Sequence, residues 1–169
     1  LLMFAPLFSD KYEINIYGKK DRIKLKDIIE HMLDPIFWPA SFNDFKAKLN
    51  LHTIEDKINL SDNLIVKSQI HNHPNGAFSY KILVDNKKIT YITDCEYVSG
   101  NISKKLIQFA KNSDLLIHDS HFTKEDLPSH KGWGHSSWDQ AVAMAEKSNS
   151  KQLALYHYNP DYDDKTIKL

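Results

Sequence analysis

The chain has 169 residues, and its 22 Lys and Arg side chains balance its 22 Asp and Glu, so the formal net charge is zero. This length allows one domain with a sizeable core, and 41% hydrophobic with 26% charged residues is typical of a globular protein and not of a disordered one. Zero net charge argues against bulk electrostatic capture of nucleic acid. No apolar run reaches the roughly 20 residues of a membrane span, so we expect no membrane partner.

The single cysteine, Cys95, excludes an internal disulfide and a zinc site made of several cysteines. A chain without disulfides suits a reducing compartment, so we expect a cytoplasmic protein. Arg22 is the only arginine, which leaves almost no means of recognising phosphate by paired guanidinium hydrogen bonds. Histidine is the unusual residue type, because seven of the nine lie between His71 and His157.

In the first part of the chain, the apolar pattern predicts one strand and two helices. Residues 12–17 alternate like a half-buried strand, and residues 25–33 place apolar side chains at helical spacing. Ser41 with Asp44 is a capping box, which predicts a short helix that continues through Leu49.

The second part of the chain has a more regular pattern. Short apolar or alternating runs predict strands, and apolar residues at helical spacing predict helices between them. The predicted strands are 64–70, 78–84, 89–93, 115–117 and 153–156, and the predicted helices are 103–111 and 137–147. This alternation predicts an α/β layered architecture, with residues 1–169 as a single domain.

Residues able to bind metal stand at or just past the ends of the predicted strands. They are His73, Asp94, the pair His118 and Asp119, and His157. In a sheet flanked by helices, such strand ends meet at one edge, where ligand sites gather. The separations are too long for a finger-type motif but suit a site built from several loops. Imidazoles with a carboxylate are the ligands expected for zinc, manganese or iron in a hydrolase.

Each of these residues also has a plainer interpretation. A histidine after a strand can be a turn residue with satisfied hydrogen bonds, and Asp94 can cap its own loop. His71 forms a His-x-His pair with His73 and is a candidate second ligand, although its place on the strand favours a structural role. His121 and His130 lie in a polar loop, so we expect both to be exposed to solvent.

His135 lies in the segment Gly132-Trp133-Gly134-His135, just before a predicted helix. The two glycines allow the backbone to approach another group closely. An imidazole next to a helix N-terminus and a bound phosphate can act as a proton donor or a phosphate contact. The alternative is that His135 only caps the helix.

Five segments, in this order, resemble the metallo-β-lactamase superfamily, in its branch of phosphodiesterases and ribonuclease Z-like hydrolases. The resemblance extends from about Ala5 to Asp164. The segments are Asn72-His73-Pro74, Tyr91-Ile92-Thr93-Asp94, Leu115-Leu116-Ile117-His118-Asp119-Ser120, Gly134-His135-Ser136-Ser137 and Leu155-Tyr156-His157.

The resemblance implies an αβ/βα sandwich that holds two divalent metal ions, zinc or alternatively manganese or iron. It implies that His73 binds one metal, that Asp94 bridges both, and that His157 binds the second. It also implies that His135 contacts the scissile phosphate and assists the leaving group. His118 and Asp119 match a family position beside the ligands, where they would support them without binding metal.

One departure from the family is large, because its His-x-His-x-Asp-His string does not occur in this sequence. We therefore expect the chain to be the C-terminal portion of a longer protein, with its fold incomplete at the N-terminus. We also expect this chain alone to be inactive, since most of the family's ligands would be absent. Strand edges left without partners would favour a homodimer.

For the complete protein, the resemblance implies a metal-dependent phosphodiesterase acting on a small or nucleotide-like phosphodiester. A ribonuclease Z-type endonuclease that processes tRNA 3′ ends is the alternative. Related bacterial enzymes carry a tRNA-binding arm between the counterparts of His73 and Asp94, and the 20 residues between them here leave no room for it. A metal-free binding or regulatory module with the same fold is a third hypothesis.

Overall fold

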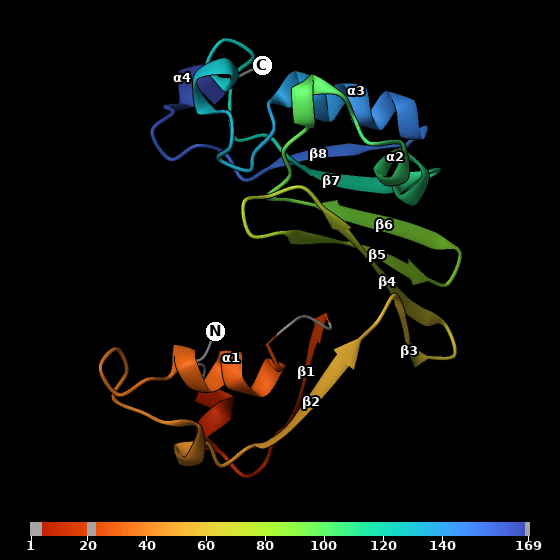
Figure 1. Ribbon diagram of the computed structural model, residues 1–169. Helices are drawn as coiled ribbons and strands as arrows, with labels where there is room; N and C mark the ends of the chain where they lie inside the picture. The colour runs from red at the N-terminus through yellow and green to blue at the C-terminus, as the bar shows by residue number, and fades with distance from the viewer. Residues whose placement is uncertain (1–4, 20–22, 168–169) are drawn as a thin grey trace. The chain divides into compact units, whose positions relative to one another are not determined.

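The computed structural model describes residues 5–19 and 23–167, which divide into two compact units, residues 1–56 and 57–169 (Figure 1). The single domain expected over residues 1–169 stays a prediction. Within the described residues, no helix has the length and apolar character needed to cross a membrane.

The first unit is built on a two-stranded parallel sheet with one helix. Strand β1 (Glu13–Lys19) pairs with β2 (Lys48–Ile54), and helix α1 (Leu25–Met32) lies between them in the chain. The strand predicted over residues 12–17 and the helix predicted over residues 25–33 are thus confirmed. A short 3₁₀ turn, η1 (Ala5–Phe8), precedes β1 in the chain, and another, η2 (Phe42–Asp44), lies between α1 and β2. Its buried apolar side chains are Leu7, Ile29, Leu33, Ala47 and Ile54.

The predicted helix from Ser41 through Leu49 is wrong. The capping box itself forms, since the Ser41 N–H donates to Asp44 Oδ2 at 2.6 Å, but the helix ends after the single turn η2. Residues 48–52 alternate polar and apolar side chains with the period of a strand, and residues 48–54 pair in register with β1. The hydrogen bonds of that pairing outweigh the local helix start.

The second unit contains a six-stranded sheet in the order β3-β4-β5-β6-β7-β8. Strands β3 to β6 are antiparallel neighbours, whereas β6, β7 and β8 are parallel. The strands are β3 (Lys57–Ser61), β4 (Leu64–His71), β5 (Ala77–Val84), β6 (Lys87–Ile92), β7 (Leu115–Asp119) and β8 (Leu153–Tyr156). The five strands predicted in this part of the chain are confirmed, and β3 is an additional one.

The directions of these strands determine at which edge of the sheet the candidate site residues lie. Because β4 and β6 are both antiparallel to β5, they run the same way as each other and as β7 and β8. The C-terminal ends of these four strands therefore lie at one edge of the sheet. His73, Asp94, Asp119 and His157 stand at or just past those ends.

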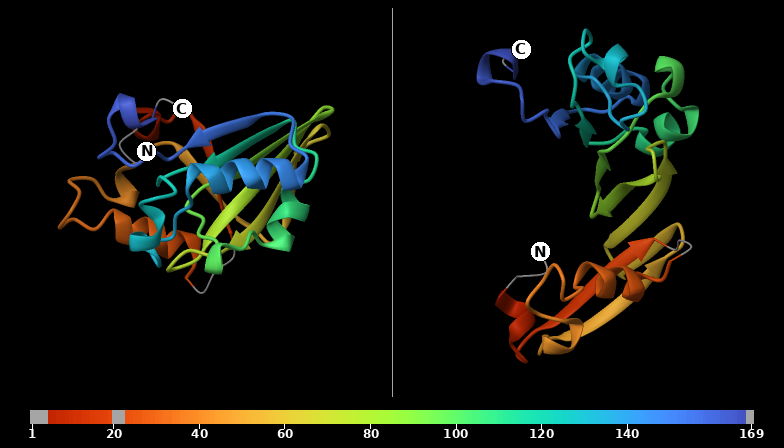
Figure 2. Two further views of the ribbon diagram at one scale, coloured as in Figure 1. Left: turned by 90° about the horizontal axis from the view of Figure 1, so that it is seen from above. Right: turned by 60° about the vertical axis from the view of Figure 1, so that its left-hand side comes forward.

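Helices α2 (Lys104–Ala110) and α3 (Trp138–Ser148) pack on one face of this sheet (Figures 1 and 2). The predicted capping box of Ser137 and Gln140 opens α3, and Asn149 in a left-handed conformation ends it. The core between the helices and the sheet includes Ile92, Leu106, Ala110, Leu116 and Met144. Three short elements complete the unit, namely η3 (Val98–Gly100), η4 (Leu127–His130) and α4 (Asp164–Ile167).

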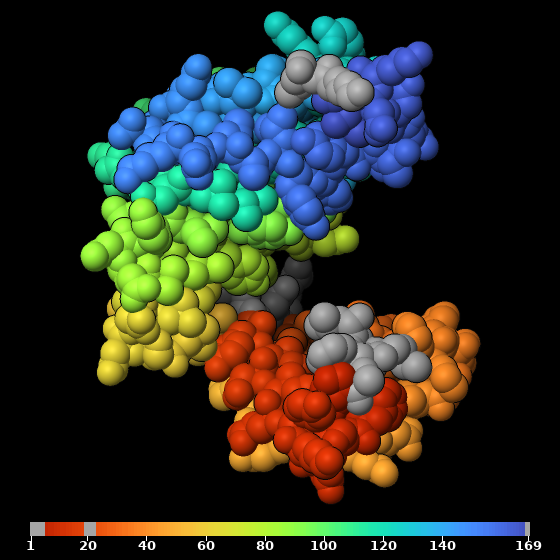
Figure 3. Space-filling model, turned by 180° about the vertical axis from the view of Figure 1, so that it is seen from behind, coloured from red at the N-terminus to blue at the C-terminus, as the bar shows by residue number. Residues whose placement is uncertain are grey.

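The other face of the sheet carries half-buried apolar and aromatic side chains. Tyr80 pairs with Tyr91 and Tyr91 with Ile117, so these three side chains form a row across the strands. Seen from behind, residues 77–92 and 115–119 lie at the surface (Figure 3). Helices on one face of a mixed sheet confirm the predicted α/β architecture for this unit.

Candidate metal centre

Two overlapping groups of possible metal ligands lie at this edge of the sheet. One group is His73, Asp94 and His135, and the other is His121, His135 and His157, with the ligand atoms of each group within 4.8 Å of one another. Each of the five side chains comes from a different place, just past β4, β6, β7 or β8 or just before α3. The structure therefore brings together His73, Asp94, His135 and His157, four residues that the sequence singled out.

Asp94 and His157 both have left-handed backbones, with φ angles of 54° and 63°. This conformation is uncommon outside glycine and concentrates at functional sites. Nδ1 of His157 lies 3.6 Å from Oδ1 of Asp94 and 3.6 Å from Oδ2 of Asp119. The imidazole of His157 is thus next to two carboxylates without a close hydrogen bond to either.

His71 is buried and both of its ring nitrogens already have partners. Nδ1 is 2.8 Å from the Ser79 hydroxyl, and Nε2 is 3.1 Å from the carbonyl of Thr93 and 3.0 Å from that of Asp94. Burial lowers the pKa of His71, which favours the neutral ring. His71 therefore has the structural role, holding the turn that carries Asp94, and is not a ligand.

Asp119 is fully buried and holds His135 in place. Its Oδ2 accepts from Nδ1 of His135 at 3.0 Å, and its Oδ1 accepts from the backbone N–H of Ser136 at 3.0 Å and of His121 at 3.1 Å. Burial by itself raises the pKa of Asp119, but these hydrogen bonds outweigh it and lower the pKa. The same bond to Asp119 raises the pKa of His135 and leaves its Nε2 for another partner.

His118, the other half of the predicted pair, lies in the core. It is fully buried, donates from Nδ1 to the Asp119 carbonyl at 2.7 Å, and accepts at Nε2 from the Tyr97 hydroxyl at 2.6 Å. Burial lowers the pKa of His118. Of the pair, only Asp119 directs its side chain to the candidate ligands.

The loop that carries His135 is fixed by Glu96. The Glu96 carboxylate accepts from the backbone N–H of Gly132 at 2.8 Å and of Gly134 at 2.9 Å. Gly134 has a φ of +92°, and a Cβ there would lie 2.2 Å from Cδ2 of His73. Of the two glycines predicted to allow a close approach, Gly134 is thus the one against which the His73 ring lies.

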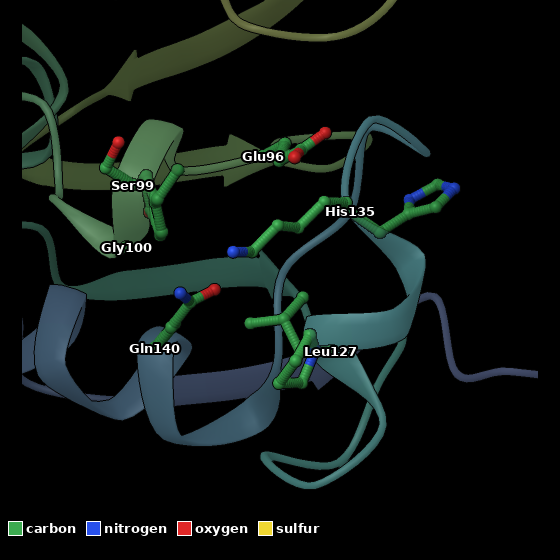
Figure 4. Close-up of a pocket in the computed structure, with 9 residues that line it drawn as sticks. Glu96, Ser99, Gly100, Leu127, His135 and Gln140 are labelled. Atoms are coloured by element: carbon green, nitrogen blue, oxygen red, sulfur yellow. The ribbon is translucent and has the colours of Figure 1, made fainter.

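A cavity of about 350 Å³ lies beside this loop (Figure 4). In the close-up the His135 imidazole points away from Ser99, Gly100 and Gln140. The lining residues are Glu96, Tyr97, Ser99, Gly100, Leu127, Pro128, Lys131, His135 and Gln140.

The expectation that His121 and His130 are solvent-exposed is wrong, since both are partly buried. Nδ1 of His121 lies 2.9 Å from the His157 carbonyl, and its ring stacks on His135 with centroids 4.4 Å apart. His130 stacks on Phe122, away from the ligand groups. Sequence reasoning could have found His121 by the rule used for the others, because it comes two residues after the end of β7.

The chemistry of these donors fits a divalent transition metal. Imidazole nitrogens with a carboxylate oxygen are the usual protein ligands of zinc and of iron or manganese in hydrolases. His135 and His121 each engage Nδ1 with an oxygen of the protein, which is how metal-binding histidines are commonly oriented.

Comparison with known proteins agrees with the fold. Residues 21–158 match the family model described as the β-lactamase superfamily domain. The chain belongs to the metallo-β-lactamase superfamily, as its resemblance implied. Within this superfamily, the chain is similar to ribonuclease Z of Thermoplasma volcanium. The two are 27% identical over an alignment 195 positions long, which covers 90% of this chain and 62% of that protein. The chain thus spans less than two thirds of the length of this relative.

Two solved structures share the fold. Human tRNase Z, short form, has a TM-score of 0.70 at 20% identity, covering 88% of this chain and 61% of that one. A diphosphatase from the PhnP family has a TM-score of 0.62 at 18% identity, covering 93% of this chain and 52% of that one. At these identities the similarity establishes the metallo-β-lactamase fold, so the αβ/βα class expected for the chain is confirmed.

Proposed function

We propose that the whole protein is a metal-dependent hydrolase that cleaves phosphodiester bonds. The observation that carries the proposal is the meeting of His73, Asp94, His135 and His157 at one edge of the sheet in a chain of this superfamily. The relative named ribonuclease Z supports a phosphodiester as the bond that is broken.

His73, Asp94 and His157 are the residues we expect to hold two divalent ions, zinc or alternatively manganese or iron, together with ligands from the rest of the whole protein. When bound, such ions supply Lewis-acid polarisation of a phosphoryl oxygen. His135 would act as the proton donor, because the Asp119 bond raises its pKa and leaves Nε2 to protonate the departing oxygen. Asp119 would fix the orientation of the His135 ring.

We propose a small or nucleotide-like phosphodiester as the substrate. Strands β5 and β6 form a hairpin that occupies the chain between His73 and Asp94, where the resemblance puts the tRNA-binding arm of related bacterial enzymes. Zero net charge also gives a polyanion little long-range attraction.

A tRNA 3′-end endonuclease is the second candidate, since the relative from Thermoplasma volcanium is named ribonuclease Z. The two candidates differ in the substrate that they turn over efficiently. A metal-free binding module with this fold would turn over neither, and would contain no His-x-His-x-Asp-His string in the residues that precede Leu1 in a longer protein.

The test is an assay of the purified whole protein loaded with zinc or manganese. We expect hydrolysis of bis(p-nitrophenyl) phosphate or of a cyclic nucleotide, and much slower cleavage of a precursor tRNA with a 3′ trailer. His135→Ala should reduce the rate by about 10²- to 10⁴-fold, the usual contribution of a proton donor. His31→Ala removes an exposed imidazole on α1 and is the matched control. Absence of hydrolysis of every diester would overturn the hydrolase proposal, and full activity of His135→Ala would overturn the role of His135.

A further inference from the structure

Trp133 is an exposed aromatic residue that the proposed chemistry does not use. It is 59% exposed, although it lies only two residues before His135. Two peptide units span at most about 7.6 Å, so the backbones of the two residues are close together. The buried Phe122 ring contacts both side chains, with its centroid 6.4 Å from that of Trp133 and 6.1 Å from that of His135. An open aromatic surface therefore lies near the group that we expect to protonate the leaving oxygen.

The indole of Trp133 is held in one place even though it is exposed. The Trp133 backbone N–H donates to the His130 carbonyl at 3.2 Å, and the indole packs edge-to-face with the His130 ring at a centroid distance of 4.8 Å. The backbone N–H groups of the neighbours Gly132 and Gly134 both donate to the Glu96 carboxylate. A ring that is already fixed in this way loses little conformational freedom when it binds a ligand.

The residues next to Trp133 leave room for a flat ligand. Both of its sequence neighbours are glycines, and a Cβ at Gly132 would meet nothing within 4 Å. Every nucleobase has a planar π face and can stack on such a ring, whichever base it is. Among the groups that a phosphodiester can carry, the exposed indole therefore fits a nucleobase.

We propose that Trp133 is the stacking platform for the base of the leaving nucleoside, so that the substrate is a phosphodiester with a nucleobase on its leaving side. This inference rests on the proposed function, which puts the leaving oxygen at His135. It narrows the small or nucleotide-like phosphodiester to one nucleotide class. Because stacking tolerates every base, we expect only a modest preference among the four bases.

The test measures the binding of a nucleotide without hydrolysis. AMP supplies a phosphate with its nucleoside, and ribose 5-phosphate supplies the same phosphate without a base. In the whole zinc-loaded protein, we expect AMP to shift the ¹H–¹⁵N signal of the Trp133 indole N–H and ribose 5-phosphate to leave it in place. This signal is identified by its absence from the spectrum of Trp133→Leu, a variant that keeps an apolar side chain but has no ring.

The affinities of the variants separate stacking from a structural role. Trp133→Leu should raise the dissociation constant of AMP about 5- to 100-fold, the effect of losing one base–aromatic stack, and leave that of ribose 5-phosphate unchanged. Trp133→Phe should recover part of the affinity for AMP, because it restores a π face. Trp38→Leu alters an exposed tryptophan of the first unit and is the matched control, which should bind both ligands like wild type.

The outcomes distinguish this inference from the proposed function. A Trp133 signal that AMP does not move would overturn the stacking role, and so would equal losses of affinity for AMP and ribose 5-phosphate in Trp133→Leu. No bond is broken in these measurements. A protein that stacks AMP on Trp133 but hydrolyses no diester would therefore contradict the proposed function alone, and one that hydrolyses diesters with the Trp133 signal unmoved would contradict only the stacking.

Discussion

At the scale of single residues, the candidate site depends on a contact that only glycine allows. A Cβ at Gly134 would lie 2.2 Å from Cδ2 and 2.7 Å from Nε2 of His73, whereas a Cβ at Gly132 would meet nothing within 4 Å. Both glycines have positive φ angles, +92° and +86°, so alanine at either position costs about 1–2 kcal/mol of backbone strain.

We therefore expect both Gly134→Ala and Gly132→Ala to lose stability to urea, Gly134→Ala the more because its Cβ would also lie 2.7 Å from Cδ of Pro74, while only Gly134→Ala displaces His73. The measurement is the ring ¹⁵N spectrum of His73 and His135 in each variant, alongside urea unfolding. If the His73 signals move equally in the two variants, the close approach to Gly134 does not decide the position of His73.

Lys81 shows how a buried cation can serve the fold. It is 8% exposed, and its Nζ donates at 2.9 Å to the carbonyls of Phe109 and Lys111, at the C-terminal end of α2. Lys81→Met should lower the free energy of unfolding by about 1–3 kcal/mol, because two part-buried backbone carbonyls lose a charged donor. Lys67→Met alters the exposed lysine paired with it on β4 and should stay within about 0.5 kcal/mol of wild type. Equal effects of the two variants in chemical denaturation would contradict the role of Lys81.

At the scale of elements, Asp114 links three parallel strands at the end of the sheet opposite the candidate site. It comes just before β7, and its side chain accepts from the Lys88 N–H at 2.8 Å and from Nζ of Lys151 at 2.7 Å. The bond from Lys151, followed by that from Lys88, lowers the pKa of Asp114. A carboxyl with a lowered pKa stabilises the fold above its unfolded pKa and loses this contribution as the pH falls through the folded one.

We expect the stability of wild type to fall more steeply below about pH 4, the ordinary range of aspartate, than that of Asp114→Asn. Asp62→Asn, in the exposed turn between β3 and β4, is the control and should follow wild type. Urea unfolding across the acid range checks this, and parallel curves for the three proteins would contradict it.

The elements also explain which parts of the fold and site were predictable. Strands such as 64–70 and 115–117 could be predicted, because burial on one or both faces of a strand requires apolar residues in an alternating or a continuous run. Residues 41–49 were assigned to a helix because the capping box at Ser41 is a local signal, whereas the pairing of residues 48–54 with β1 is not. His73, Asp94 and His157 were found by their places after strands. His121 also follows a strand, but it was assigned to an exposed polar loop, because its bond to the His157 carbonyl in a distant loop leaves no signal in the local sequence.

At the scale of the whole molecule, the larger core and the candidate ligands lie in the second unit. The buried cluster of Ile92, Leu106, Leu116 and Met144 belongs to it, as do all residues of the two ligand groups. The first unit has a two-stranded sheet, an arrangement that is marginally stable unless a helix or another surface packs against it.

This distribution predicts that residues 57–169 fold without residues 1–56. Trp133 and Trp138 report on the second unit, and Trp38, in the first, is removed from the full chain by Trp38→Phe. We expect the shortened chain to unfold cooperatively in urea, with the midpoint and slope that these tryptophans give in full-length Trp38→Phe, because the slope follows the surface exposed on unfolding. A gradual transition, or a clearly lower midpoint, would show that the second unit needs the first and would favour the single domain predicted for residues 1–169.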